Sequence, residues 1–299
     1  MKLNGLHVLL TYQCTMQCDH CFVWGSPWQN GVLSLEQVGE IVAQAHQLDT
    51  IEWIYFEGGE PFLYYPILLR GVQMATAAGF RVGVVSNAYW ATTPEDARAW
   101  LKPLADMVAD LTVSSDRFHY TEADDRHARN AVQAASDLGI PIGQISVASP
   151  SDTFTAVHSG GQLPVDQQSA VMYRGRAVRE LAPRAAQKPW DELTACNNED
   201  LREPGRIHVD PLGNLHICQG ISIGNLFKRP LKKIIAEYDP DSHPVCGPLL
   251  AGGPAALVGE YALPHGSHYA DACHLCYDAR LALRGRFPDE LAPDQVYGV

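Results

Sequence analysis

Residues 6–21 read LHVLLTYQCTMQCDHC, in which an apolar run leads directly into three cysteines. Leu6–Thr11 is rich in Leu and Val, which predicts a buried β-strand. Cys14, Cys18 and Cys21 follow at the carboxyl end of this strand. The stretch therefore predicts a strand that presents three thiols on one short loop.

Strand-like runs and helical patterns alternate in the first part of the chain. Ser34 is a predicted N-cap, Thr93 followed by Pro94 begins another helix, and Gly79 and Gly139 are predicted helix stops. Repeated βα units predict a parallel sheet, here an α/β fold with a partial (β/α)6 barrel, whose functional loops lie at the carboxyl ends of the strands. The later strands are expected at Ile51–Phe56, Phe80–Ser86, Val108–Ser114, Ile140–Ala148 and Ala170–Tyr173, and the helices at 35–48, Pro66–Ala78, from Thr93, and Thr121–Leu138.

The spacing Cys14-x3-Cys18-x2-Cys21 suits a metal centre. Three thiolates on one tight loop can bind three corners of a [4Fe–4S] cube and leave the fourth iron without a protein ligand. Two other interpretations stay open, buried core thiols and a zinc knuckle. Zinc takes four protein ligands in a closed site, so a zinc knuckle needs a distant fourth ligand such as His20 or Cys196.

A second motif, Glu57-Gly58-Gly59-Glu60-Pro61, follows the second expected strand. Paired glycines let the backbone approach a ligand closely, and a carboxylate can accept from an ammonium group. With the upstream cysteine triad, it resembles the Gly-Gly-Glu motif of the radical S-adenosylmethionine (SAM) superfamily, in which SAM chelates the open iron. The resemblance implies that one electron from the cluster cleaves SAM and that the resulting 5′-deoxyadenosyl radical abstracts a substrate hydrogen. It also implies that Gly58, Gly59 and Glu60 hold the SAM amino group, with an ordinary strand-end turn as the alternative.

Polar residues at later strand ends are further candidates for SAM contacts. In the family, such residues contact the carboxylate and the ribose of SAM, and small polar groups suit ribose hydroxyls as donors and acceptors. Helix capping and turn chemistry are the alternative. The resemblance implies SAM contacts for Ser86, Asn87, Ser115 and Asp116.

Two basic residues complete this set. Arg174-Gly175-Arg176-Ala177 resembles the Gly-Arg-Ala element that precedes the C-terminal extension in many family members. The resemblance implies that Arg176 clamps the SAM carboxylate in bidentate fashion. His119 is a candidate catalytic proton acceptor, with a surface or core histidine as the alternative.

Five further cysteines lie in the last third of the chain. Cys196 and Cys218 bracket a predicted hairpin and Cys273-x2-Cys276 follows, which resembles the auxiliary-cluster extension of the family called SPASM or, in its shorter form, twitch. The resemblance implies that these four thiolates hold one auxiliary [4Fe–4S] cluster, because the full SPASM pattern needs about seven cysteines. Cys246 is predicted to be a free thiol, or to replace Cys196. A structural zinc site of four cysteines is the alternative.

The pattern of elements changes after Ala177. This change predicts a radical SAM partial barrel at 1–180 and a small α+β SPASM/twitch-like auxiliary-cluster domain at 181–299. Gly213 lies in the turn of the expected hairpin. The second unit is expected to contain strands Arg206–Asp210 and Asn214–Cys218, helix Leu231–Tyr238, an irregular segment Pro248–Gly259 and helix His274–Arg286.

Composition argues against several classes of partner. The formal net charge is −12 and the basic residues form no long run, unlike proteins that bind nucleic acids or anionic membranes. No segment reaches the roughly 18 uninterrupted apolar residues of a membrane helix, and no signal peptide is evident. We therefore expect a cytoplasmic protein. The resemblance to the radical SAM superfamily implies an external electron donor such as flavodoxin or ferredoxin.

Four thiolates leave the auxiliary cluster no open iron, which favours electron transfer over direct substrate ligation. We expect the substrate radical to lose one electron to this cluster, so that the substrate is oxidised. The leading hypothesis is a peptide substrate and a ribosomal peptide maturase. Many such maturases carry a separate leader-binding domain before the barrel, and Cys14 is expected to leave no room for one. Several peptide maturases also lack this domain, so the expectation favours neither substrate class. A dehydrogenase of a small polar metabolite and a non-catalytic zinc-binding protein are the alternatives.

Overall fold

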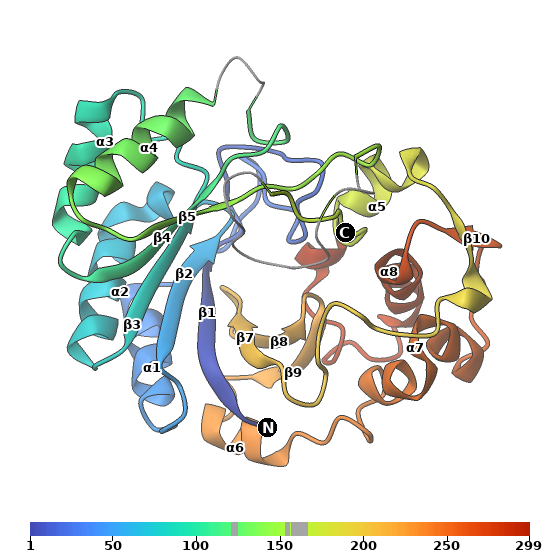
Figure 1. Ribbon diagram of the computed structural model, residues 1–299. Coiled ribbons are helices and arrows are strands. Elements are labelled where there is room, and N and C mark those ends of the chain that lie inside the picture. Colours follow the sequence, from blue (N-terminus) through green and yellow to red (C-terminus); the bar gives the residue numbers. More distant parts are fainter. Residues whose placement is uncertain (121–124, 153–155, 157–166) are drawn as a thin grey trace.

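The structure is a computed structural model that describes residues 1–120, 125–152, 156 and 167–299 (Figure 1). Its strands are β1 (Leu3–Thr11), β2 (Trp53–Gly58), β3 (Arg81–Ser86), β4 (Val108–Ser114), β5 (Ile142–Ile145), β6 (Lys188–Pro189), β7 (Gly205–Val209), β8 (Asn214–Cys218), β9 (Ile221–Asn225) and β10 (His268–Tyr269). Its α-helices are α1 (Leu35–Ala45), α2 (Tyr65–Ala77), α3 (Pro94–Leu101), α4 (Arg126–Asp137), α5 (Ala177–Glu180), α6 (Leu231–Glu237), α7 (Cys246–Glu260) and α8 (Ala272–Leu283).

The large sheet has eight strands in the order β5-β4-β3-β2-β1-β7-β8-β9. β1 to β5 run parallel and follow one another across the sheet, as repeated βα units require. β7 continues the sheet parallel to β1, and β8 and β9 add antiparallel strands. Figure 1 shows α1 to α4 on one side of the curved sheet and α7 and α8 on the other, and α6 packs into the same core as α1. The fold is thus the expected α/β partial barrel.

Two cores stabilise this arrangement. The outer core lies between the sheet and α1 to α4, and it includes Leu6 and Val8 of β1. The inner core joins Leu9 and Tyr12 to residues of α7 and α8. The N-terminal and C-terminal parts therefore share both a sheet and a core, and the division at 180/181 stays a prediction.

Local signals explain where two helices begin. Ser34 caps α1 in a capping box, because its Oγ accepts from the Gln37 N–H at 3.2 Å and Gln37 Oε1 accepts from the Ser34 N–H at 2.8 Å. Thr93 caps α3 by accepting from the Asp96 N–H at 3.1 Å, with Pro94 in the first turn. Both predicted helix starts are confirmed.

The sixth position of the barrel is less regular than predicted. In place of a strand over Ala170–Tyr173, the described residues form one isolated parallel bridge between Ser169 and Val147. The strand does not continue because the N–H of Tyr173 donates to the carboxylate of Asp271, at 3.2 Å, instead of to a neighbouring strand. The sequence pattern carries no sign of this contact from a distant segment.

The segment 248–259, predicted to be irregular, is helical. α7 spans it, with a break at Gly252 and Gly253, where the backbone dihedrals are not helical. Leu249 and Leu257 on either side of the break pack in the inner core. The prediction was wrong because tertiary packing overrides the low helix propensity of glycine.

The remaining expected elements are found, with ends that differ by a few residues. The predicted hairpin is β7 and β8, and the last two predicted helices correspond to α6 and α8. The predicted helix start at Thr121 lies outside the described residues, and α4 covers the rest of that helix. Within the described part of the chain, the helices are too short or too polar to cross a bilayer.

Candidate active site

The cysteine triad lies on the loop that leaves β1. The N–H of Cys21 donates to the carbonyl oxygen of Cys18 at 3.1 Å, which closes a tight turn. Two further amides point at sulfur atoms, because the Met16 N–H donates to Cys14 Sγ at 3.4 Å and the Gly25 N–H donates to Cys21 Sγ at 3.2 Å. Hydrogen bonds of this kind stabilise metal-bound thiolates and tune cluster potentials.

The thiols of the triad lie in a water-poor environment. Cys14 and Cys18 are buried, and Cys21 is half-buried. Burial raises the pKa of the Cys14 thiol, to which Glu60 and the other two thiols add, and burial and Cys18 raise the pKa of Cys21. A bound cation removes this penalty, since a metal-ligating thiol is deprotonated outright. The donor set therefore fits a cluster held by three protein thiolates.

Gly58 and Gly59 hold the second motif against the cysteine loop. The Gly59 N–H donates to the Thr11 carbonyl at 2.7 Å, and the Glu60 N–H donates to the Gln13 carbonyl at 2.8 Å. A Cβ at Gly58 would lie 2.4 Å from the Thr11 oxygen, and one at Gly59 would lie 2.2 Å from the Gln13 oxygen. Both positions require glycine because the two strand ends approach so closely. Their contact with SAM stays a prediction.

Glu60 is fully buried and binds the end of β3. Its Oε1 accepts from the Ser86 hydroxyl at 2.9 Å and from the Phe62 N–H at 3.0 Å, and its Oε2 accepts from the Asn87 N–H at 2.8 Å. Burial raises the pKa of Glu60 to about 7, although these hydrogen bonds lower it. Glu60 and Ser86 thus lock two predicted SAM-binding segments together, and their own contacts with SAM stay predictions.

Asn87 reaches from the end of β3 to the cysteine loop. Its Nδ2 donates to Thr15 Oγ1 at 3.0 Å and to Cys14 Sγ at 3.5 Å. Its Oδ1 accepts from the Tyr89 N–H at 3.0 Å, which fixes the orientation of the amide. The SAM contact of Asn87 stays a prediction, and its hydrogen bond to Cys14, a predicted cluster ligand, is a contact that the sequence did not predict.

Asp116, beyond the end of β4, connects two histidines. Its Oδ1 lies 2.7 Å from His119 Nδ1, and its Oδ2 lies 3.6 Å from Nε2 of His20 in the cysteine loop. Burial lowers the pKa of His20 to about 4. Burial also disfavours a charged His119, but the Asp116 carboxylate outweighs this effect and raises the pKa of His119. His119 therefore lies beside the cysteine loop, and the half-buried Ser115 precedes Asp116.

Arg176 is buried against the cysteine loop. Its Nη1 donates to the Cys18 carbonyl at 2.7 Å and its Nη2 to the Gly25 carbonyl at 2.8 Å. Gly175, with a φ of +60°, makes this approach possible, because a Cβ there would lie 2.6 Å from the Cys21 carbonyl. Both terminal nitrogens of Arg176 therefore donate to the cysteine loop. Its predicted contact with the SAM carboxylate stays a prediction.

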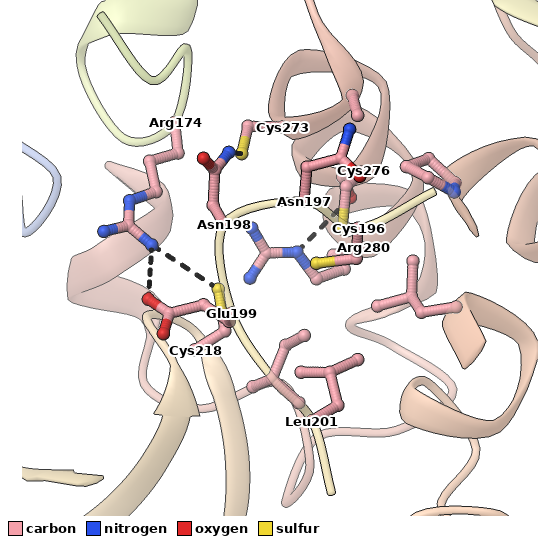
Figure 2. Close-up of a pocket in the computed structure, with 14 residues that line it drawn as sticks. Arg174, Cys196, Asn197, Asn198, Glu199, Leu201, Cys218, Cys273, Cys276 and Arg280 are labelled. Carbon is pink, nitrogen blue, oxygen red and sulfur yellow. Dashed lines mark hydrogen bonds and ion pairs between the residues drawn. The ribbon is translucent and has the colours of Figure 1, made fainter. Parts of the chain in front are cut away.

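A pocket in the C-terminal part brings four cysteines together (Figure 2). Cys196 precedes β7, Cys218 ends β8, and Cys273 and Cys276 lie near the start of α8. The helix N-terminus places positive partial charge near the last two sulfurs, which favours an anionic cluster. These are the four predicted auxiliary ligands, and four thiols that line one pocket suit a four-thiolate [4Fe–4S] cluster. No three of their sulfurs lie within 4.8 Å of one another, as the shorter spacing around a single zinc ion would require.

Two buried arginines line the same pocket. Arg174 Nη1 donates to Cys218 Sγ at 3.6 Å and to Glu199 Oε1 at 3.4 Å, as Figure 2 shows. Arg280 Nε donates to the carbonyl oxygen of Cys276 at 3.3 Å. Two guanidinium groups therefore stand beside four thiols, with Glu199 as a neighbouring anion.

Cys246 is fully buried at the start of α7 and does not line this pocket. Burial raises the pKa of Cys246 to about 12, against a hydrogen bond with Tyr238 that lowers it. Cys218, Cys276 and Cys196 also raise the pKa of Cys246, so this thiol lies near the pocket cysteines, and its predicted role as a free thiol stays a prediction.

Sequence reasoning missed several polar neighbours of the two cysteine sites. Asn198 Nδ2 donates to Cys273 Sγ at 3.1 Å, and Arg280 has the contact described above. Asn198 and Arg280 carry no local signal, because only tertiary packing brings them to the pocket. Arg174 could have been found, since it directly precedes the recognised Gly175-Arg176 element.

Comparison with known sequences identifies one relative and one family. "Putative peptide biosynthesis protein YydG" from Bacillus subtilis (strain 168) is 28% identical over 120 residues, which are 40% of this chain and 38% of that protein. The matched chain thus spans well under half the length of this curated relative. Residues 8–155 match the family model described as the radical SAM superfamily.

Solved structures share the fold at low identity. Native anSMEcpe with bound AdoMet and Cp18Cys peptide has a TM-score of 0.51 and 11% identity, covering 95% of this chain and 96% of that one. BtrN in complex with AdoMet and 2-DOIA has a TM-score of 0.50 and 15% identity, covering 78% and 82%. With the cysteine triad, the Gly-Gly-Glu segment and the family match in agreement, the chain is a member of the radical SAM superfamily, which implies a [4Fe–4S] cluster and SAM.

Proposed function

We propose that this radical SAM enzyme oxidatively modifies a peptide, as a ribosomal peptide maturase. The observation that carries the proposal is the pocket lined by Cys196, Cys218, Cys273 and Cys276, because four converging thiols suit a second cluster. The two clusters, when bound, would supply the electron that cleaves SAM to a hydrogen-abstracting 5′-deoxyadenosyl radical and an acceptor for the electron that the substrate radical loses. The substrate would be oxidised by two electrons overall.

The residues of the N-terminal site have distinct roles in this proposal. Cys14, Cys18 and Cys21 would ligate the SAM-binding cluster, and Arg176 would keep their loop in the ligating conformation. An external donor such as flavodoxin or ferredoxin would reduce this cluster. The proposed SAM contacts are Gly58, Gly59, Glu60, Ser86, Asn87, Ser115 and Asp116.

The surroundings of the second pocket support an electron-accepting role. A cluster gains one negative charge on reduction, so a nearby cation stabilises the reduced form. Arg174 and Arg280 are the cations at this pocket. Four protein ligands leave the cluster no position for a substrate atom, which also favours electron transfer.

Support for a peptide substrate comes from YydG, which is described as a putative peptide biosynthesis protein. A dehydrogenase of a small polar metabolite is the second candidate, because the same oxidation scheme converts an alcohol to a carbonyl. The pocket of four cysteines serves both candidates equally. Assays with each class of substrate therefore have to distinguish them, with loss of two hydrogens as the product signature.

Anaerobic reconstitution followed by iron and sulfide analysis tests the second cluster. We expect about eight irons per chain, as two cubes require, and formation of 5′-deoxyadenosine with a chemical reductant. The double variant Cys273→Ala, Cys276→Ala should hold about four irons and still cleave SAM, but lose net substrate oxidation. Cys246→Ala is the matched control, since this cysteine is buried outside the pocket, and it should keep about eight irons.

Three outcomes would contradict the proposal. About four irons in the parent protein would remove the auxiliary cluster and the oxidation scheme with it. Bound zinc without SAM cleavage would instead favour the non-catalytic zinc-binding alternative. Full substrate oxidation by the double variant would give the second site a structural role only.

A further inference from the structure

His7, Glu57 and His208 stand on three adjacent strands of the large sheet. His7 of β1 pairs in register with His208 of β7, and Glu57 of β2 pairs with Leu9, two residues further along β1. Side chains alternate between the two faces of a strand, so these three lie together on the inner face of the sheet. The residue before each of them belongs to the outer core, namely Leu6, Phe56 and Ile207.

The nitrogen and oxygen atoms of these three side chains are as far apart as the ligand atoms around one metal ion. His7 Nδ1 lies 3.3 Å from Glu57 Oε2, and His208 Nε2 lies 3.1 Å from Glu57 Oε1. One ligand atom from each residue lies within 4.8 Å of the other two. Metal bonds of about 2.0–2.2 Å place neighbouring ligand atoms about 3 Å apart. We propose that His7, Glu57 and His208 form a binding site for a divalent first-row transition metal ion on the inner wall of the barrel.

Glu57 gives a second, independent indication of a bound cation. Its Oε1 is buried and has no partner that meets the geometry of a hydrogen bond, although Nε2 of His208 lies 3.1 Å away. A buried carboxylate oxygen without a donor is unfavourable unless a cation binds it. Burial raises the pKa of Glu57, but His7 and His208 outweigh burial and hold that pKa well below its usual range. The carboxylate is therefore ionised and available as a ligand.

Aromatic contacts hold the ligands in place. The His7 ring stacks on Tyr55 with centroids 4.8 Å apart, and its centroid lies 5.0 Å from that of His208. Tyr55 in turn stacks on Trp53, and the Arg81 guanidinium carbon lies over the Trp53 ring, 4.0 Å from its centroid. The site is thus pre-oriented, as metal sites with well-supported ligands are.

Two imidazoles and one carboxylate are the ligand set that iron, manganese and related ions take with open coordination positions. Glu57 directly precedes Gly58, and the ring of Phe22, which follows the cysteine triad, lies 6.4 Å from that of His208. The site is therefore a neighbour of the cysteine loop. A carbonyl or carboxylate oxygen of the substrate would complete the coordination of the ion. Only this role of the substrate rests on the proposed function.

Mn²⁺ is the probe for this site, because it prefers nitrogen and oxygen ligands to thiolates. Mn²⁺ would be titrated into the anaerobic, cluster-loaded enzyme, and electron paramagnetic resonance would measure the concentration of free Mn²⁺. Binding of Zn²⁺ to the same enzyme would be measured by calorimetry. We expect about one Mn²⁺ per chain, and affinity at least about 100-fold weaker in Glu57→Gln and in His208→Asn, since losing even an outer partner of a ligand weakens binding about 10–100-fold. His46→Asn changes an exposed histidine and should bind as the parent does.

A second group with the same donors, His20, Asp116 and His119, lies in the SAM-binding site. Asp116→Asn should leave Mn²⁺ binding unchanged, and loss of the ion in this variant would overturn the inference. So would a parent enzyme that binds neither ion, or variants that bind as tightly as the parent. Unchanged iron content shows that the variants are folded, and His7→Asn tests the same site if Glu57→Gln loses its clusters. The iron count of the parent tests the proposed function separately from all these outcomes.

Discussion

Arg176 Nη1 donates to the carbonyl oxygen of Cys18 at 2.7 Å, so a residue near the end of the predicted barrel holds the loop that follows its first strand. Nη2 binds a second carbonyl of the same loop, that of Gly25. A planar guanidinium can hold two carbonyl oxygens in one fixed geometry. The conformation of the cysteine triad therefore depends on the segment that leads into the C-terminal part of the chain.

Replacement of Arg176 should loosen the SAM-binding cluster. Arg176→Lys keeps the charge but cannot hold both carbonyls, and the loss of a buried, charged hydrogen bond costs about 1.5–3 kcal/mol. We expect SAM cleavage to fall about tenfold or more, with less iron in the SAM-binding cluster and the auxiliary cluster retained. Arg98→Lys, at an exposed arginine of α3 that pairs with Asp137, is the control. Parent-like activity in Arg176→Lys would remove its role in holding the loop.

Asn87 should tune the potential of the SAM-binding cluster. Its Nδ2 donates to Cys14 Sγ, and hydrogen bonds to ligating sulfurs stabilise the reduced cluster. We expect Asn87→Ala to shift the midpoint potential to more negative values, on the order of tens of millivolts, in a redox titration followed by electron paramagnetic resonance. Asn130→Ala removes an amide that donates only to the Ala91 carbonyl and should leave the potential unchanged. An unshifted potential in Asn87→Ala would limit Asn87 to shaping the loop.

The sequence predicts those parts of the fold that local chemistry determines. Ser34 and Thr93 begin helices because their side chains satisfy backbone amides within the same turn. The break in the sixth strand and the helical α7 were not predictable in this way. Each depends on a distant partner, Asp271 for Tyr173 and the inner core for Leu257.

The same distinction applies to the candidate site. The cysteines could be recognised from their spacing, and the structure brings all four predicted auxiliary cysteines to one pocket. His7 and His208 are far apart in sequence and meet only because β7 pairs with β1. Arg280 likewise reaches the pocket from the third turn of α8, a position that no motif marks.

Arg174 and Glu199 should shift the potential of the auxiliary cluster in opposite directions. Arg174 donates to Cys218 Sγ and stabilises added electrons, whereas the Glu199 carboxylate beside it disfavours them. We expect a more negative midpoint potential in Arg174→Gln and a more positive one in Glu199→Gln, each on the order of tens of millivolts. The midpoint potential of the SAM-binding cluster serves as the internal reference. Shifts of the same sign in both variants would contradict this electrostatic explanation.

Glu60 should titrate near neutral pH in the folded protein. Burial raises its pKa to about 7, so the folded state binds a proton that the unfolded state releases near its ordinary, lower pKa. The raised pKa of Glu60 adds up to about 3 kcal/mol to the free energy of unfolding. This contribution is fully present below the pKa of the unfolded state and is lost as the pH rises through about 7. Infrared spectra should show a protonated carboxyl band that disappears between about pH 6 and pH 8 and is absent in Glu60→Gln. A band unaffected by this substitution would belong to another carboxyl group.

Two glycines of α7 should respond in opposite ways to alanine. Gly253 has a φ of +66°, and a Cβ there would lie 2.3 Å from the Ala195 nitrogen, next to Cys196, whereas a Cβ at Gly259 would meet nothing within 4 Å. Gly253→Ala should lower stability by about 1–3 kcal/mol and reduce the iron of the auxiliary cluster, because the loop that carries Cys196 must move. Gly259→Ala should raise stability by about 0.5–1 kcal/mol, since alanine loses less conformational freedom in a helix. Thermal unfolding of the cluster-loaded proteins measures both effects, and normal iron content in Gly253→Ala would show that Cys196 does not depend on the break in α7.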